Sequence, residues 1–173
     1  HGLELLAAGA DALDVGGEST RPGAAPVPPE EEARRVLPVV RALARASDAP
    51  VSIDTTKAWI AERALGEGAR VVNDVGAGLL DDGMLPLVAR AGCTYVLMHM
   101  QGEPRTMQRD PRYGDVVRDF TAFLRARAAA CVEAGIDPER LAVDPGFGFG
   151  KTLDHNLELL RDLAHLRSLG LPV

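Results

Sequence analysis

The stretch VSIDTTKAWIAERALGEGARVVND, residues 51–74, contains one complete strand–helix–strand repeat. Apolar and β-branched residues at 51–54 and again at 70–74 are typical of short buried strands. Between them, residues 57–67 have helical spacing and end near two glycines, which commonly terminate helices. A helix that joins two apolar strands returns the chain to the same end of a sheet, so this stretch predicts two parallel strands.

The same alternation continues outward from this repeat over the whole chain. Apolar strands with helical connections predict a parallel sheet covered by helices. Two architectures fit the pattern at this point, an open doubly wound sheet and a (β/α)8 barrel. Further strands are expected at 12–16, 94–100 and 141–144, with another beginning at 171, and further helices at 1–9, 28–46, 82–91, 115–134 and 154–169.

The composition is that of an ordinary globular domain. The 173 residues include 19 Lys or Arg and 25 Asp or Glu, for a net charge of −6, and 46% are hydrophobic. This balance excludes a disordered acidic tail and a basic arm that binds nucleic acid. It gives no general attraction to DNA, RNA or an anionic membrane, so any phosphate contact must come from a local site. No apolar run approaches the roughly 18 residues that a membrane helix needs.

The cysteines indicate the cell compartment of this domain, and the chain ends indicate that it is part of a longer protein. Cys93 and Cys131 are far apart in the sequence and are predicted to be buried free thiols, which fits a reducing compartment and a cytoplasmic protein. The chain begins with His1 instead of Met, and residues 171–173 read as the opening of a strand. We therefore expect an interior piece of a longer protein.

Polar side chains follow the predicted strands where each one ends. Asp54, Asn73 and Asp144 close three of them, and in a parallel sheet these ends meet at one rim, where ligands bind. Two carboxylates and a carboxamide suit a flat heterocycle with alternating donors and acceptors, such as a 2-amino-4-oxo ring. Taken singly, Asp54 is also suited to cap a helix and Asp144 to fix a turn.

Two further segments carry candidate anion-binding groups. Thr20 and Arg21 lie in a loop rich in Gly and Pro that follows the strand at 12–16, and Arg is suited to bidentate phosphate recognition, although a surface Arg without a role is the alternative. Gly150-Lys151-Thr152 resembles the end of a phosphate-binding P-loop, but Pro145 occupies the position where that motif requires glycine. A nucleotide triphosphatase is thereby excluded. Lys151 is noticeable as one of only two lysines, and it is interpreted as a solvated residue. His99 has no partners at ligand spacing and is interpreted as a hydrogen-bonded structural histidine.

Five strings, taken together in their order, identify a family resemblance. The chain resembles the dihydropteroate synthase family of pterin-binding barrels, whose members make a folate precursor and are inhibited by sulfonamides. The strings that carry the resemblance are DVGGESTRPG at 14–23, SIDT at 52–55, VNDV at 72–75, LMHMQGEP at 97–104 and DPGFGFGK at 144–151.

The resemblance implies a (β/α)8 TIM barrel, of which residues 1–173 form one domain truncated at both ends, with strands 2 to 6 and the start of strand 7. It also implies a transferase reaction in which p-aminobenzoate displaces diphosphate from 6-hydroxymethyl-7,8-dihydropterin diphosphate. The implied cofactor is Mg2+, with no metal ligands in this piece, and the complete enzyme is expected to be a homodimer. The piece alone is expected to be inactive, because the family's first-strand Asn loop, pterin-contacting Lys, Ser-Arg-Lys and Arg-x-His motifs are missing from it.

The resemblance also assigns roles to individual residues. Residues matching Asp54, Asn73, Met100 and Asp144 contact the pterin, and Asp54 and Asp144 are the catalytic pair. Residues matching Thr20, Arg21, Pro22 and Phe149 cover the p-aminobenzoate and diphosphate region. Two alternatives are a methyltetrahydrofolate-binding methyltransferase domain, which lacks the 18–23 and 146–151 strings, and a non-catalytic synthase-like subunit.

Overall fold

The structure is a computed structural model that describes residues 1–21, 23–102 and 106–173. Pro22, one of the predicted site residues, and residues 103–105 lie outside the described residues. No helix in the described part of the chain is long and apolar enough to cross a membrane.

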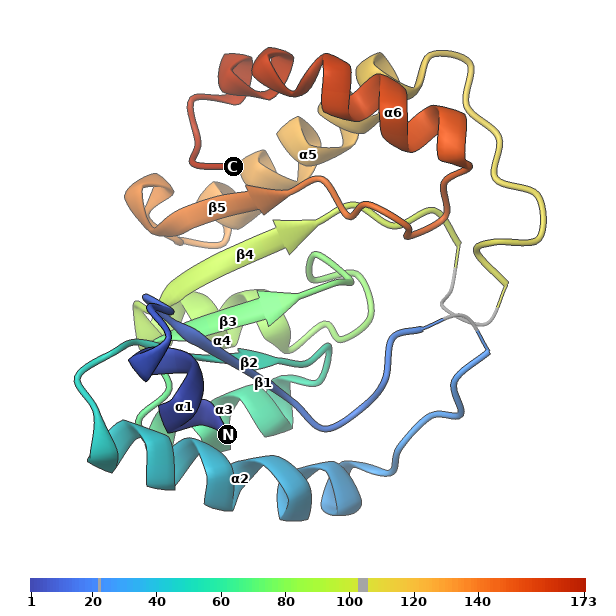
Figure 1. Ribbon diagram of the computed structural model, residues 1–173. Coiled ribbons are helices and arrows are strands. Elements are labelled where there is room, and N and C mark those ends of the chain that lie inside the picture. Colours follow the sequence, from blue (N-terminus) through green and yellow to red (C-terminus); the bar gives the residue numbers. More distant parts are fainter. Residues whose placement is uncertain (22, 103–105) are drawn as a thin grey trace.

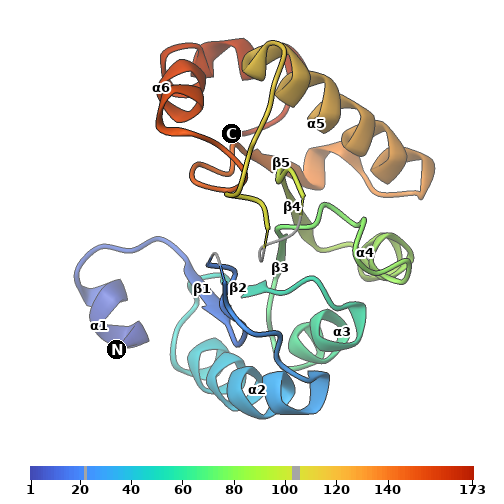
Figure 2. The same ribbon diagram turned by 90° about the vertical axis from the view of Figure 1, so that its right-hand side faces the viewer.

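Five parallel strands form one sheet in the described residues, in the sequential order β1-β2-β3-β4-β5. A doubly wound sheet instead reverses its strand order at a switch point and carries helices on both faces. Here the sheet curves into an arc with α2, α3, α4 and α5 on its outer side (Figure 2). The fold is therefore a partial (β/α)8 barrel, which confirms the predicted fold class. The strands are β1 (Leu13–Gly16), β2 (Val51–Asp54), β3 (Val71–Asp74), β4 (Thr94–Met98) and β5 (Leu141–Asp144).

The helices begin and end close to the predicted positions. Helix α2 starts after Pro28 with three glutamates in its first turn, where the helix dipole favours negative charge. Helix α5 is capped by Asp115, whose side chain accepts the Arg118 N–H at 2.9 Å. The helices are α1 (Gly2–Ala7), α2 (Pro29–Ala46), α3 (Ala58–Gly66), α4 (Met84–Ala91), α5 (Val116–Glu133) and α6 (Leu153–Arg161), with 3-10 helices η1 (Pro138–Arg140) and η2 (Leu163–Leu169).

Three boundaries differ from the predictions. Strand β4 ends at Met98 because the next carbonyl, that of His99, accepts a hydrogen bond from the Lys151 ammonium. The single helix predicted over 154–169 is divided at Asp162 into α6 and η2. Residues 171–173 form no strand, but the Val143 N–H donates to the Pro172 carbonyl at 2.9 Å. Pro172 has no backbone N–H, so it cannot donate a hydrogen bond back to β5.

Alternation along the strands gives the sheet an apolar outer face and an inner face that combines Asp54, Asn73 and Asp144 at the rim with apolar residues such as Val71 and Val96. Val51, Ile53, Val72, Leu97 and Val143 are all buried beneath the helices. The intervening residues face the hollow of the arc, because successive strand side chains point to opposite faces. Figure 1 shows the arrowheads of all five strands pointing the same way, so the strand-end loops gather at one end of the sheet.

Asp74 is the acidic strand-end residue that faces the helices. It is 1% exposed and accepts hydrogen bonds from the Tyr95 hydroxyl at 2.6 Å, the Gly76 N–H at 2.7 Å and the Gly78 N–H at 2.8 Å. These contacts hold the β3–α4 loop, in which Ala77 adopts a left-handed φ of 49°. The Asp74 carboxylate therefore has a structural role in shaping this loop.

We expect Asp74→Ala to lower the free energy of unfolding by about 2–4 kcal/mol, because it leaves buried donors without an acceptor. Asp82→Ala, at an exposed position of the same loop, should change it by less than about 0.5 kcal/mol. Urea unfolding followed by circular dichroism measures both values. Equal effects of the two substitutions would contradict the assigned role.

Candidate active site

The structure brings three predicted residues to the same rim and the same face. Asp54 pairs in register with Asn73 on the neighbouring strand. Asp144 ends β5 and pairs in register with Met98 of β4, so one strand separates it from Asn73. All three are partly exposed, whereas the residues before them in each strand are buried. The two carboxylates and the carboxamide thus stand together on the inner face of the barrel, as the sequence predicted.

Asp14 belongs to the same polar face, although the sequence analysis did not select it as a site residue. The Asn73 side-chain N–H donates to the Asp14 carboxylate at 3.0 Å. This hydrogen bond orients the Asn73 amide and leaves its oxygen and second N–H available. Because strand side chains alternate between the two faces, Asp14 lies on the same face of β1 as Gly16. This alternation in the sequence could have identified Asp14 as a site residue.

Asp54 has a perturbed electrostatic environment. Burial raises its pKa to about 7, and the nearby carboxylates of Asp14, Asp74, Glu32 and Asp144 contribute in that order. Among the described residues, the Asp54 carboxylate accepts no hydrogen bond. A ligand with two adjacent N–H donors would therefore supply the partners that the protein does not.

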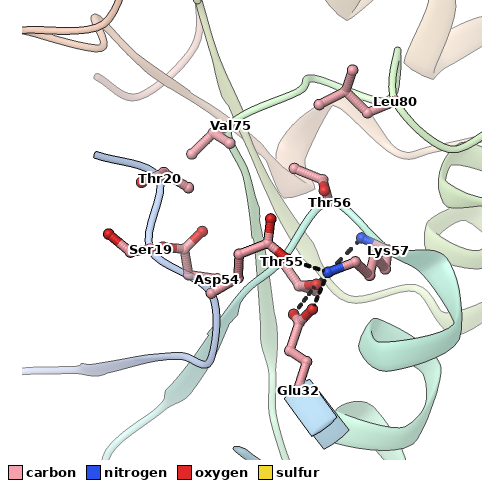
Figure 3. A pocket seen from close by; sticks show the side chains of 10 residues that line it. Ser19, Thr20, Glu32, Asp54, Thr55, Thr56, Lys57, Val75 and Leu80 are labelled. Carbon is pink, nitrogen blue, oxygen red and sulfur yellow. Dashed lines mark hydrogen bonds and ion pairs between the residues drawn. The ribbon is translucent and has the colours of Figure 1, made fainter. Parts of the chain in front are cut away.

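A pocket of about 120 Å³ lies between Asp54 and the β1–α2 loop (Figure 3). Thr20 lines this pocket, which places one predicted loop residue beside one predicted pterin residue. Arg21 is exposed and does not line it. The pocket residues are Glu18, Ser19, Thr20, Glu32, Asp54, Thr55, Thr56, Lys57, Val75 and Leu80.

Met100 and Phe149 occupy other parts of the rim. Met100 lines a cavity of about 60 Å³ that shares Val75 and Leu80 with the pocket beside Asp54, so the two spaces adjoin. Phe149 is half-buried in the β5–α6 loop and lines neither space. Met100 is thus next to the acidic face, and Phe149 is placed only on a neighbouring loop.

Lys151 is buried, which corrects the expectation that it could be a solvated residue. It is 3% exposed, and its ammonium donates to the carbonyls of His99 at 3.1 Å, Gly146 at 2.9 Å and Phe149 at 2.9 Å. Burial lowers its pKa to about 8. The ammonium ties the end of β4 to the loop that follows β5. The sequence feature that could have indicated a specific role for Lys151 is the rarity of lysine, since this chain has only two.

The glycines of the 144–151 string permit this close contact between the two loops. Gly146 and Gly150 both have a left-handed φ of 61°. A Cβ at Gly146 would lie 2.5 Å from the His99 carbonyl oxygen, and one at Gly150 would lie 2.6 Å from that of Gln101. Only glycine fits at both positions.

His99 is a structural residue without the predicted hydrogen bond at its Nδ1. Among the described residues this buried atom has no partner. The ring packs against Phe120 and Phe123, with centroid distances of 5.1 Å and 4.8 Å. Burial and the nearby Lys151 ammonium lower the pKa of His99 to about 4, so it stays neutral.

A family model described as pterin binding enzyme matches residues 1–173, the whole chain. The chain belongs to the pterin binding enzyme family. The chain, matched over its full length, has Asp54 in β2, Asn73 in β3 and Asp144 in β5.

Relatives and solved structures agree with this family. A dihydropteroate synthase of Neisseria meningitidis serogroup C is 51% identical over 96% of this chain and 59% of its own length. The Yersinia pestis dihydropteroate synthase in a sulfonamide complex is 46% identical with a TM-score of 0.95, covering 98% of this chain and 62% of that one. The Xanthomonas albilineans dihydropteroate synthase in complex with 7,8-dihydropteroate is 44% identical with a TM-score of 0.89. The match covers 100% of this chain and 60% of that one. The chain therefore spans about three fifths of the length of these relatives.

We expect the effect of Asp54→Asn on stability to depend on pH. The native pKa of about 7 exceeds the unfolded value, so the native state binds the extra proton and loses stability as pH rises from about 4 to about 7. Asp54→Asn should therefore raise the unfolding temperature at a pH of about 8 and raise it by clearly less at about 5.

Differential scanning calorimetry of the wild-type and variant chains at the two pH values measures this dependence. Asp82→Asn, at an exposed position, should leave the unfolding temperature unchanged at both. A stabilisation by Asp54→Asn that is the same at both pH values would contradict the raised pKa.

We expect Lys151→Met to destabilise this chain by about 2–4 kcal/mol, because three buried or partly buried carbonyls lose their donor. Urea unfolding gives the free energy, and hydrogen exchange at residues 146–150 should accelerate. Arg109→Met removes an exposed cation from the preceding loop and serves as the control. If Lys151→Met unfolds at the wild-type urea concentration, the ammonium does not hold the two loops together.

Proposed function

We propose that the protein containing this chain is a dihydropteroate synthase. It would join 6-hydroxymethyl-7,8-dihydropterin diphosphate to p-aminobenzoate, giving 7,8-dihydropteroate and diphosphate. The observation that carries the proposal is the acidic inner face, where the Asp54 carboxylate, beside Asn73, receives no hydrogen bond from the described residues. The similarity to a synthase described in complex with 7,8-dihydropteroate supports it.

The proposed pterin grip follows from donor and acceptor chemistry. The Asp54 carboxylate would accept the two parallel N–H bonds of the 2-amino edge of the ring. Asn73, oriented by Asp14, offers one donor and one acceptor for the adjacent ring atoms. One oxygen of Asp144 accepts the Gly146 N–H at 2.7 Å, and its other oxygen remains for the ligand. Met100 would supply an apolar wall.

The reaction needs no protein nucleophile. The bond between the exocyclic methylene carbon and the diphosphate oxygen breaks, and the electron pair leaves with diphosphate. The positive charge that develops is delocalised over the dihydropterin ring, and Asp144 and Asp54 would stabilise it electrostatically. The aniline nitrogen of p-aminobenzoate then forms the new C–N bond and loses a proton. Catalysis is thus proposed to rest on positioning and charge complementarity.

The p-aminobenzoate and diphosphate groups are assigned to the rim loops. Thr20 lines the pocket beside Asp54, and exposed Arg21 is next to it in the chain. A guanidinium there is suited to bidentate contact with a departing diphosphate. Phe149 is proposed for the p-aminobenzoate wall, and so is Pro22, which lies outside the described residues.

Magnesium is proposed only as the counter-ion of diphosphate. In the described part of the chain, no group of three His, Cys, Asp or Glu side chains could hold a metal ion. These residues therefore do not fit a resident Mg2+ site, and we assign no reaction step to a protein-bound ion. Mg2+ commonly binds substrate phosphates and keeps several waters, which fits delivery with the diphosphate substrate.

The complete protein is proposed to be a cytoplasmic homodimer whose turnover requires segments beyond this chain. Leu153, Leu157 and Leu160 are exposed at helical spacing on α6 and give an apolar face that supports self-association. Cys93 and Cys131 are buried free thiols, which supports a reducing compartment. Light scattering of the complete protein measures its oligomeric state.

We expect isothermal titration of the folded chain with the pterin diphosphate and Mg2+ to give micromolar binding. Asp144→Ala should weaken this binding by about tenfold to a hundredfold, because it removes a charged acceptor. Asp48→Ala, at an exposed position before the opposite end of β2, should leave the affinity unchanged. Circular dichroism confirms that each variant is folded. A folded chain that gives no binding heat would contradict the proposed pterin grip.

A further inference from the structure

Lys57, the second of the two lysines, lies between β2 and α3 at the back of the pocket beside Asp54. Its ammonium forms ion pairs with Glu18 and Glu32 and donates to the Val27 carbonyl at 3.0 Å. Figure 3 shows dashed lines that join Lys57 and Thr55 to Glu32, close to Asp54. Neither the sequence analysis nor the proposed chemistry uses this group.

The contacts of Lys57 close the base of the β1–α2 loop. Glu18 lies at the start of this loop and Val27 at its end, so one ammonium joins both. The Val27 N–H also donates to the Glu18 carboxylate at 3.1 Å. Arg35 adds a hydrogen bond from α2 to the Gly17 carbonyl at 3.0 Å. The residues between these anchors include Thr20 and Arg21.

The same cluster is connected to the acidic face through Thr55. The Thr55 hydroxyl donates to Glu32 at 2.6 Å and accepts the Lys57 backbone N–H at 3.2 Å. Thr55 directly follows Asp54 in the chain. Glu32 is 0% exposed, so it depends on these donors for solvation. A partly buried group of charges thus joins the loop base to Thr55, the residue next to Asp54.

The charge of Lys57 is retained in this position. Burial opposes it, but the hydrogen bonds and charges of Glu18 and Glu32 outweigh burial and raise the pKa of Lys57. A compact ammonium with three donors fits three converging acceptors, whereas a planar guanidinium is suited to flat pairs of oxygens.

We propose that Lys57 is a positioning residue that latches the β1–α2 loop and so holds Thr20 beside Asp54, with Arg21 next to Thr20 in the chain. The proposal rests on the proposed function, because that function supplies the substrate that Thr20 and Arg21 would bind. Lys57 itself contacts no substrate. It acts through Glu18 and Val27 on the loop and through Glu32 and Thr55 on the end of β2.

Hydrogen exchange of the chain without substrate tests the latch directly. Glu18→Gln should accelerate exchange over residues 19–28 by about tenfold or more, since it removes a charged acceptor while the Lys57–Glu32 pair remains. Glu30→Gln makes the same change at an exposed position in the first turn of α2 and should leave exchange unchanged. Wild-type exchange over 19–28 in Glu18→Gln would overturn the proposal.

Variants of Lys57 provide the second measurement. Lys57→Met should accelerate loop exchange at least as much as Glu18→Gln. Lys57→Arg should restore only part of the protection, because a planar guanidinium keeps the charge but does not match the three converging acceptors. Because Lys57→Met leaves buried Glu32 with one donor fewer, this variant can lose its global fold. The conclusion therefore relies on Glu18→Gln and Lys57→Arg, whose overall unfolding temperatures should stay close to wild type.

Steady-state kinetics of the complete enzyme with Glu18→Gln distinguishes this proposal from the proposed function. We expect the KM for p-aminobenzoate to rise by about tenfold, with pterin affinity preserved, since Asp54, Asn73 and Asp144 are unchanged. A complete wild-type protein without synthase activity would overturn the proposed function. In that case the hydrogen-exchange measurements would still show whether Lys57 holds the β1–α2 loop. Faster loop exchange with unchanged KM would show an ion pair of purely structural role and overturn the positioning proposal.

Discussion

Each of the strands β2 to β5 buries alternate side chains beneath the outer helices, and this requirement sets the placement of the remaining groups. Ile53 and Val72 are fully buried, so the residues that follow them, Asp54 and Asn73, must face the hollow of the arc. A slip of one residue in either strand would exchange the two faces. The acidic face is thus a geometric consequence of packing the apolar one.

The polar face concentrates negative charge without balancing it. Asp14, Asp54 and Asp144 share the rim, and burial together with the neighbouring carboxylates raises the pKa of Asp54 to about 7. Such an arrangement costs stability in the free protein and is relieved by a ligand that brings N–H donors or positive charge. The carboxylates that destabilise the free protein are therefore the same ones that are proposed to act in catalysis.

The two lysines perform a related task in different loops. Lys57 joins the β1–α2 loop to α2, and Lys151 joins the end of β4 to the β5–α6 loop. In each case three oxygen atoms converge on one ammonium in a poorly solvated position. The remaining cations of this chain are arginines and histidines, so lysine is used where a compact three-donor group is needed.

The sequence by itself determined the order of strands and helices, the parallel sheet and the rim carrying Asp54, Asn73 and Asp144, because these follow from local periodicity and from where strands end. The family resemblance added the barrel architecture, which the sequential strand order and one-sided helices of the structure confirm as a partial barrel. Only the tertiary structure decided the partners of Asp14, Lys57 and Lys151. Their contacts join segments far apart in the chain, and no local pattern specifies which donors and acceptors folding brings together.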